Sequence, residues 1–130
     1  MVKGILHPQD AVLAADCGAD AVIVSNHGGR YLDSSQAPIE VLPEVLDAVG
    51  KRITIMVNSG FRRGGDVVKA LALGAQAVLI GRATLYGTAA AGQAGAARAI
   101  EIFREEIDRV MALIGCRSVA ELNSEYLVRP

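Results

Sequence analysis

Short apolar runs alternate along this chain with longer segments in which hydrophobic residues recur at helical spacing. The short runs predict buried strands at Val2–Leu6 (the end of a strand), Ala21–Val24, Arg52–Val57 and Ala77–Ile80. The longer segments predict helices over Pro8–Cys17, Pro38–Val49, Asp66–Leu73 and Ala94–Ile114. Proline at a first helical position and glycine after a last one support these bounds. The Ala- and Gly-rich stretch before Ala94 predicts a loop, and Ser118 predicts the cap of a final short helix.

Two segments of the chain repeat one another. Gly18–Val24 matches Gly74–Ile80 almost position for position, and each combines a helix cap with the strand that follows it. Strands and helices alternating at this length predict parallel strands joined by right-handed crossovers. About three and a half such units are visible, whereas a closed (β/α)₈ barrel typically needs ~250 residues. We therefore expect residues 1–130 to be one partial domain of the α/β class, the C-terminal half of a TIM barrel with helices covering parallel strands.

Composition narrows the class of protein further. Hydrophobic residues make up 52% of the chain and its formal net charge is −1, which favours a well-buried core and gives no reason to expect a nucleic-acid partner. No segment has the ~18 apolar residues that a membrane span requires, and no signal peptide is recognisable. Cys17 and Cys116 lack metal-ligand spacing, so reduced structural thiols and a cytoplasmic location are expected.

The residues best suited to chemistry follow the strand Ala21–Val24. Ser25-Asn26-His27-Gly28-Gly29-Arg30 is polar and flexible, and α/β proteins place their sites at such strand ends. A lone histidine is most often a buried structural residue. Here, however, Arg30 lies three residues away and suits a bidentate grip on a carboxylate, so His27 is a candidate base acting on an acid substrate.

Two further strand ends carry glycine and arginine. Gly60–Gly64 follows one strand and Gly81-Arg82 the next, and barrel loops of this kind often bind phosphate through backbone N–H groups. Each loop alone is equally compatible with ordinary turns and solvated arginines, and their succession favours a phosphate site. Lys3 is either a surface lysine or a cation that stabilises negative charge on a cofactor at the same rim.

These motifs resemble those of a known family. Ser25–Arg30 followed by Leu32-Asp33, then Ser59–Gly64, Asp66–Ala75 and Ile80–Arg82, are similar in order and spacing to the FMN-dependent α-hydroxy acid dehydrogenases and oxidases. That family includes glycolate oxidase, lactate oxidases, mandelate dehydrogenase and flavocytochrome b2. Ala83–Gly87 and Ile114–Cys116 resemble its mandelate dehydrogenase branch. The resemblance covers nearly the whole chain.

The resemblance implies a flavoprotein oxidoreductase that converts a 2-hydroxy acid to the 2-keto acid with FMN as cofactor. It implies that His27 is the catalytic base and contacts substrate, that Arg30 anchors the substrate carboxylate, and that Lys3 lies at the flavin ring. The other cofactor-binding positions implied are Ser25, Asn58, Ser59, Gly60, Phe61, Arg62, Gly81 and Arg82; no metal is implied. It also implies a homo-oligomer in the full-length form, and peripheral membrane association stays open.

Two departures from the family pattern matter. Asn58 stands where the family usually has Asp, which keeps the shape and one acceptor but loses the charge. The family's first barrel half, with the carboxylate that orients the histidine, is absent from this sequence, so we expect the isolated chain to be inactive. Two alternatives stay open. One is another FMN- or phosphate-binding barrel such as type 2 isopentenyl diphosphate isomerase or IMP dehydrogenase, and the other is a catalytically inactive half-barrel fragment.

Overall fold

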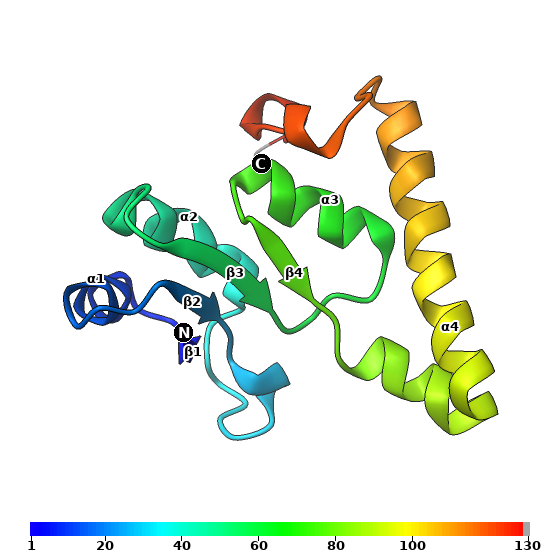
Figure 1. The fold of residues 1–130 in the computed structure, drawn as a ribbon, viewed down its shortest axis with the longest axis horizontal. Helices are drawn as coiled ribbons and strands as arrows, with labels where there is room; N and C mark the ends of the chain where they lie inside the picture. The colour runs from blue at the N-terminus through cyan, green and yellow to red at the C-terminus, as the bar shows by residue number, and fades with distance from the viewer. Residues whose placement is uncertain (129–130) are drawn as a thin grey trace. The chain divides into compact units, whose positions relative to one another are not determined.

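The structure, a computed structural model, describes residues 1–128 and alternates strands with helices throughout (Figure 1). Four strands form one parallel sheet in the order β1-β2-β3-β4, namely β1 Val2–Ile5, β2 Ala21–Val24, β3 Thr54–Asn58 and β4 Ala77–Leu79. The α-helices that follow the strands are α1 Pro8–Asp16, α2 Pro38–Val49, α3 Gly64–Leu73 and α4 Arg82–Leu113. Three 3₁₀ turns complete the order: η1 His27–Gly29, η2 Val119–Glu121 and η3 Ser124–Tyr126. The predicted parallel α/β class is confirmed.

The described residues form two compact units. The first comprises Met1–Gly60 with Leu73–Leu79, and the second comprises Phe61–Ala72 with the chain from Ile80 onward. The first unit therefore contains the whole sheet together with α1 and α2.

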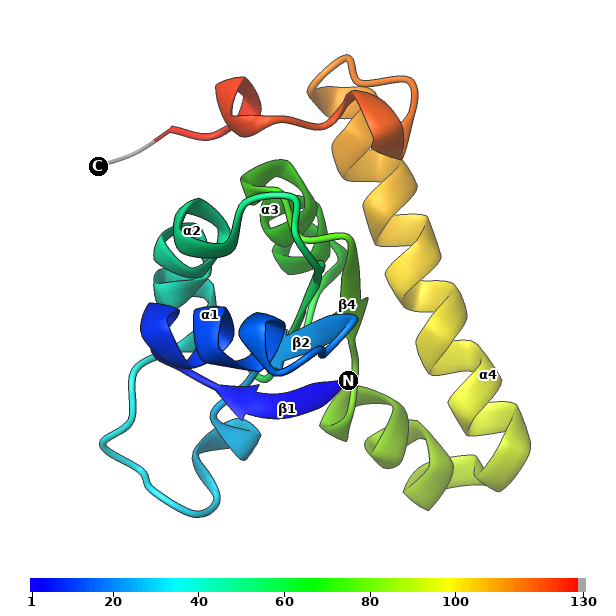
Figure 2. The same ribbon diagram turned by 60° about the vertical axis from the view of Figure 1, so that its left-hand side comes forward.

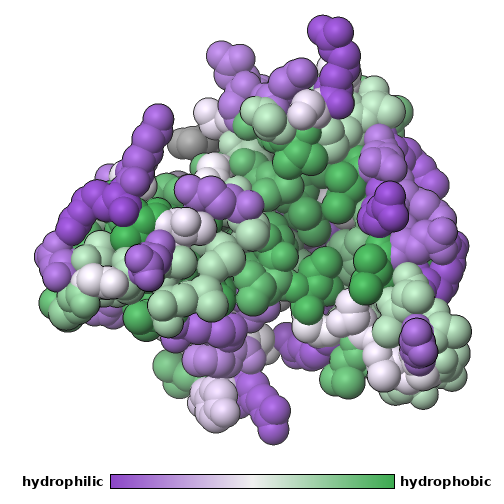
Figure 3. Space-filling model, in the orientation of Figure 1, coloured by the Kyte–Doolittle hydropathy of each residue, from purple (hydrophilic) through white to green (hydrophobic). Residues whose placement is uncertain are grey.

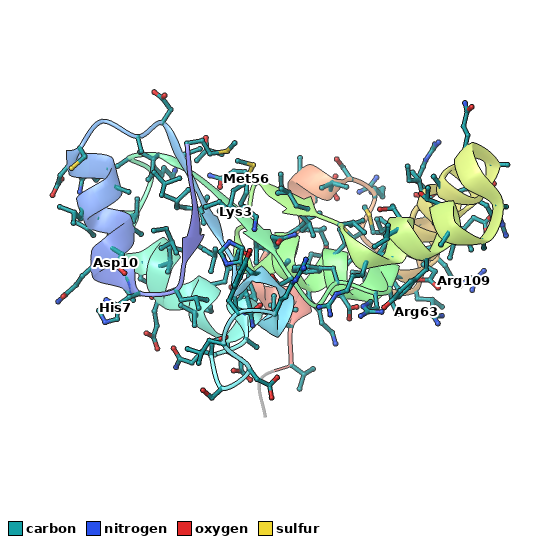
Figure 4. All side chains as sticks on the ribbon, turned by 90° about the horizontal axis from the view of Figure 1, so that it is seen from below. Lys3, His7, Asp10, Met56, Arg63 and Arg109 are labelled. Atoms are coloured by element: carbon teal, nitrogen blue, oxygen red, sulfur yellow. The ribbon has the colours of Figure 1, made fainter. Side chains whose placement is uncertain are left out.

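Helices α1 and α2 of the first unit pack against each other and against the strands (Figure 2). The core residues beneath them include Val22, Val24, Ile55 and Val57, all with 0% of their surface exposed. Burying a side chain of this size contributes roughly 1.5–3 kcal/mol, which explains why such short strands persist. The start of α1 is fixed locally: Pro8 presets the backbone at the first helical position, and the imidazole Nδ1 of His7 accepts the N–H of Gln9 at 3.2 Å. Figure 4 shows His7 and Asp10 together at this helix end.

Lys3, the first candidate site residue in the chain, lies in a row of paired residues that crosses the sheet. Lys3, Ile23, Met56 and Ala77 are partners in the parallel register, so they share one face. Alternation along each strand assigns Val22 and Ile55 to the opposite face. Figure 4 shows Lys3 and Met56 near each other, and Figure 3 shows hydrophobic residues at the surface over β3 and β4.

The second unit has its own core. Val68 of α3, Met111 of α4 and Cys116 are buried together, and Ile107, Val110 and Leu122 pack around them. The thiol of Cys116 donates to the carbonyl of Ser118, and the hydroxyl of Ser118 accepts the N–H of Ala120 at the start of η2. The cap expected at Ser118 is therefore present, on a 3₁₀ turn.

The prediction of a loop before Ala94 is wrong. Residues 82–113 are helical except at Ala91 (φ −151°) and Gly92 (φ 55°), where the chain folds back (Figures 1 and 2). Alanine has the highest helix propensity, so an Ala-rich stretch favours a helix even without an amphipathic pattern. Gly87 and Gly95 face each other across this break, and a Cβ on either one would overlap the carbonyl oxygen of the other. The pair lets the two helical segments approach backbone to backbone.

No helix within residues 1–128 is both long and apolar enough to cross a membrane.

Candidate functional site

The candidate residues of the first unit gather where β2 and β3 end. Ser25 follows β2 directly and has only 1% of its surface exposed. Its hydroxyl lies 3.1 Å from Nζ of Lys3, 3.1 Å from Oδ1 of Asn58 and 3.2 Å from Oγ of Ser59. Residues separated by 22 to 34 positions in sequence therefore meet at one buried hydroxyl.

His27 begins a tight turn held by the same hydroxyls. Its backbone N–H donates to Oγ of Ser25 at 3.2 Å, and the N–H of Gly28 donates to Oγ of Ser59 at 3.1 Å and to Oδ1 of Asn26 at 2.9 Å. His27 adopts φ 56°, a conformation that few non-glycine residues take. The turn is thus fixed both within itself and to the end of β3.

The imidazole of His27 is presented outward on this turn. Its ring meets the ring of Tyr31 edge-on at 5.2 Å between centroids, and a Cβ on Gly4 would lie 3.0 Å from its Cε1. The backbone of β1 therefore approaches the imidazole closely because residue 4 is glycine. Arg30 is exposed at the end of the turn. No acidic side chain within residues 1–128 hydrogen bonds with this imidazole, so a carboxylate orienting it is not present there.

The candidate residues of the second unit lie in the loop ahead of α3 and at the N-terminus of α4. Oδ2 of Asp66 accepts the backbone N–H groups of both Arg62 and Arg63 at 3.0 Å, which fixes the loop ahead of α3. The guanidinium of Arg62 lies over the ring of Tyr86, 5.4 Å from its centroid. Gly81 precedes α4 without a side-chain cap, and Arg82 is the first residue of that helix. An uncapped helix N-terminus beside arginine favours an anion such as phosphate.

Glu106 of α4 caps the N-terminus of α3. Its Oε2 accepts the N–H of Gly64 at 2.7 Å and its Oε1 pairs with Arg63 at 2.8 Å, while 15% of its side chain is exposed. Figure 4 shows Arg63 by the ribbon of α4. One carboxylate therefore satisfies a helix N-terminus and neutralises one arginine, leaving the guanidinium of Arg62 as the part of this loop suited to an external anion.

The structure brings five of the candidates together. Lys3, Ser25, His27, Asn58 and Ser59 are linked in the first unit by the hydrogen bonds above. Gly60 is exposed with φ 85°, and a Cβ there would meet nothing within 4 Å. Phe61, expected at the cofactor, has 6% of its surface exposed, so its ring belongs to a core and only its backbone is suited to a ligand.

Sequence reasoning missed Tyr31, Asp66, Tyr86 and Glu106. The signal for Asp66 was present in the sequence, because an acidic residue in the first turn of a helix commonly accepts preceding N–H groups. The contacts of Tyr86 and Glu106 depend on packing between segments far apart in the chain, whereas the contact of Tyr31 with His27 spans only four positions and depends on the geometry of the turn.

Fold and site together define a class: parallel β/α units whose candidate site residues follow the carboxyl ends of the strands. The model of the FMN-dependent dehydrogenase family matches residues 1–129. The chain is 50% identical over 127 residues to (S)-mandelate dehydrogenase of Pseudomonas putida, covering 98% of this chain and 32% of that protein. It is 46% identical over 127 residues to L-lactate oxidase of Nostoc sp., covering 98% of this chain and 35% of the relative. The chain belongs to the FMN-dependent dehydrogenase family.

Solved structures support the same assignment. An active mutant of (S)-mandelate dehydrogenase superposes with a TM-score of 0.95 at 48% identity, over 99% of this chain and 36% of that one. A mutant flavocytochrome b2 with pyruvate bound gives a TM-score of 0.91 at 44% identity, over 96% of this chain and 33% of that one. The predicted fold, part of a TIM barrel, is thus confirmed. The chain spans about one third of the length of the relatives it matches.

Proposed function

We propose that the protein carrying this chain oxidises a small 2-hydroxy acid to the 2-keto acid with FMN as cofactor. One observation carries the proposal. His27 and Lys3 are joined through the hydroxyl of Ser25 at the ends of the strands. The chain that contains them is 50% identical in sequence to (S)-mandelate dehydrogenase. This arrangement links His27, which can accept a proton, to Lys3, whose positive charge suits the electron-rich ring of FMN.

The residues present fit FMN. Lys3 supplies a positive charge for the ring, and Ser25 and Ser59 supply hydroxyls for the polar chain of the cofactor. Gly60, Gly81 and the backbone of Phe61 allow close approach, and Arg62 and Arg82 supply charge for the phosphate. Open space at the Cβ positions of Gly60 and Gly81 supports this role. When bound, FMN accepts the two electrons that leave the substrate carbon.

The residues of this chain then divide the remaining work. His27 takes a proton from the substrate, for which a neutral imidazole is suited because one of its ring nitrogens is an acceptor. Arg30 binds the substrate carboxylate through paired N–H donors. Oxidation of the 2-hydroxy acid to the 2-keto acid removes two electrons and two protons. One proton goes to His27, and bound FMN would receive both electrons together with the other proton.

The proposal extends to the setting of the protein. Residues 1–130 act as one partial domain, the full-length form is a homo-oligomer in the cytoplasm, and no nucleic acid takes part. A catalytically inactive chain is the second candidate for residues 1–130 by themselves. It is favoured because no acidic side chain within residues 1–128 hydrogen bonds with the His27 ring, and an imidazolium without an orienting carboxylate is less stabilised.

A chimaera tests the proposal. Residues 1–130 replace the matching third of Pseudomonas putida (S)-mandelate dehydrogenase, and the flavin absorbance is followed anaerobically as glycolate, lactate and mandelate are added in turn. We expect FMN to be retained and bleached by at least one of the three. A 3-hydroxy acid, in which the hydroxyl is one carbon further from the carboxylate, is the control and should not bleach it. Retained FMN that none of the three bleaches would overturn the proposal.

A further inference from the structure

The amide of Asn58 has protein partners on both sides. Its Oδ1 lies 3.1 Å from the hydroxyl of Ser25 and 3.4 Å from that of Ser59, and its Nδ2 donates to the carbonyl of Leu79 at 3.0 Å. Leu79 is the residue beside Asn58 in the β3–β4 register. The side chain is therefore tied to the neighbouring strand at one end and to two hydroxyls at the other.

The donors and acceptors around the hydroxyls of Ser25 and Ser59 limit where the two hydroxyl protons can lie. A serine hydroxyl has one proton and two acceptor lone pairs. Oγ of Ser25 accepts from Nζ of Lys3 and from the N–H of His27, so both lone pairs are occupied and its own proton points either to Asn58 or to Oγ of Ser59, 3.2 Å away. Oγ of Ser59 accepts from the N–H of Gly28, and in either arrangement its own proton points to Oδ1 of Asn58 at 3.4 Å, because the lone pairs of Ser25 are occupied.

The amide oxygen of Asn58 is thus the terminal acceptor of the network. By accepting the last hydroxyl proton, it leaves the lone pairs of Ser25 turned toward Lys3 and His27 and a lone pair of Ser59 turned toward Gly28. Without this acceptor the two hydroxyls have only each other, so one of their two protons is left without an acceptor. A hydroxyl that turns its proton toward an N–H group no longer holds that group.

We propose that Asn58 is a positioning residue that orients Lys3 and the His27 turn through the hydroxyls of Ser25 and Ser59. This inference rests on the proposed function of His27 and gives Asn58 a role other than direct contact with the cofactor. The backbone supports it, because Ser59 adopts φ 86°, a strained conformation for a residue with a Cβ. Such strain persists where surrounding structure requires it, often at functional sites.

Two substitutions separate the acceptor from the rest of the side chain. Asn58→Leu keeps the approximate volume and removes the acceptor, whereas Asn58→Asp keeps an acceptor for the hydroxyls, replaces the donor to Leu79 by a second oxygen and adds a negative charge. Ser59→Ala removes one arm of the network and serves if Asn58→Leu does not fold.

The first readout needs no cofactor. In the 130-residue chain, amide hydrogen exchange of His27 and Gly28 should accelerate about tenfold in Asn58→Leu and stay near the reference rate in Asn58→Asp, since one net hydrogen bond corresponds to a factor of up to roughly ten. Unchanged exchange in Asn58→Leu, or equal acceleration in Asn58→Asp, would overturn the inference.

The second readout is the rate of FMN reduction in the chimaera. Asn58→Leu should retain FMN but lose roughly 10²-fold in rate, as expected for a misplaced catalytic group, with a smaller change in KM. Asn58→Asp should restore most of the rate. A rate in Asn58→Leu within twofold of the reference would also overturn the inference. If the reference chimaera itself is not reduced while exchange changes as expected, the proposed function fails and the role of Asn58 in orienting the turn stands.

Discussion

His27 and Ser59 are the two non-glycine residues within residues 1–128 that adopt positive φ, and both lie in the same hydrogen-bonded cluster. Conformations of this kind cost on the order of 1–3 kcal/mol each. The cluster offsets that cost through hydrogen bonds to Ser25, Asn26 and Asn58 around a hydroxyl that is almost fully buried. The local strain coincides with the residues to which we assign chemistry.

Arg30→Lys tests the substrate anchor. Lysine keeps the positive charge but cannot reproduce two parallel N–H donors, so kcat/KM of the chimaera should fall about 10- to 100-fold with a raised KM. Arg52→Lys is the matched control, because Arg52 is an exposed arginine paired with Asp16 and precedes β3. Steady-state kinetics with equal effects of the two substitutions would contradict the assignment of Arg30.

Much of this site was readable from single motifs, but its connections were not. The Ser25–Arg30 run and the two Gly/Arg loops predicted a site at the strand ends. That Asn58 accepts from both serines depends on the register of β2 with β3, since Ser25 and Asn58 are 33 positions apart. A departure from the family pattern at Asn58 was visible, whereas its hydrogen-bond partners required the fold.

The elements follow the sequence pattern closely where helices are amphipathic or strands are buried on both faces. The predicted ranges Ala21–Val24 and Pro38–Val49 are confirmed without change. Helix α3 begins at Gly64, two residues before the predicted start, because Asp66 and Glu106 accept the N–H groups ahead of and at its first turn. The first segment of α4 was missed since it depends on alanine propensity and on a glycine crossing, neither of which has an amphipathic signature.

The adjacent glycines Gly64 and Gly65 at the start of α3 allow one substitution to be compared with a matched control. A Cβ on Gly64 would lie 2.5 Å from Cβ of Glu106 and from the backbone nitrogen of Ile107, whereas one on Gly65 would meet only Val110, at 3.9 Å. Gly64→Ala should therefore lower the free energy of unfolding by about 1–3 kcal/mol. Gly65→Ala should be neutral or stabilising by up to about 1 kcal/mol, because alanine favours a helix. Urea unfolding that gives both variants the same loss would contradict the close contact of α3 with α4.

The contact between Tyr126 and Cys116, in the turns after α4, predicts that the stability of the chain depends on pH. A hydrogen bond with the thiol of Cys116 raises the pKa of Tyr126 above its ordinary value, since it favours the protonated phenol. The stability from this contact is present below the pKa of the unfolded state, about 10, and is lost as pH rises through the higher folded value. Unfolding curves from pH 9 to 11 should show a decline that is smaller in Tyr126→Phe. An identical decline in both proteins would contradict the contact.

At the scale of the whole molecule, the sheet has β1 and β4 as its outer strands and hydrophobic residues at the surface over β3 and β4 (Figure 3). Unpaired strand edges and exposed apolar surface both favour association. We therefore expect the 130-residue chain to form dimers or larger species in light scattering. A stable monomer that unfolds cooperatively would contradict this expectation.

The central claim, that His27 of this chain is the base in oxidation of a 2-hydroxy acid, is tested most directly by anaerobic FMN reduction in the chimaera and its His27→Asn variant. Asparagine adopts positive φ more readily than most residues, so the turn should persist while the base is lost. We expect both proteins to hold FMN and the variant to reduce it ~10²–10⁴-fold more slowly, the usual effect of losing a general base. Reduction at equal rates in the two proteins would contradict the account.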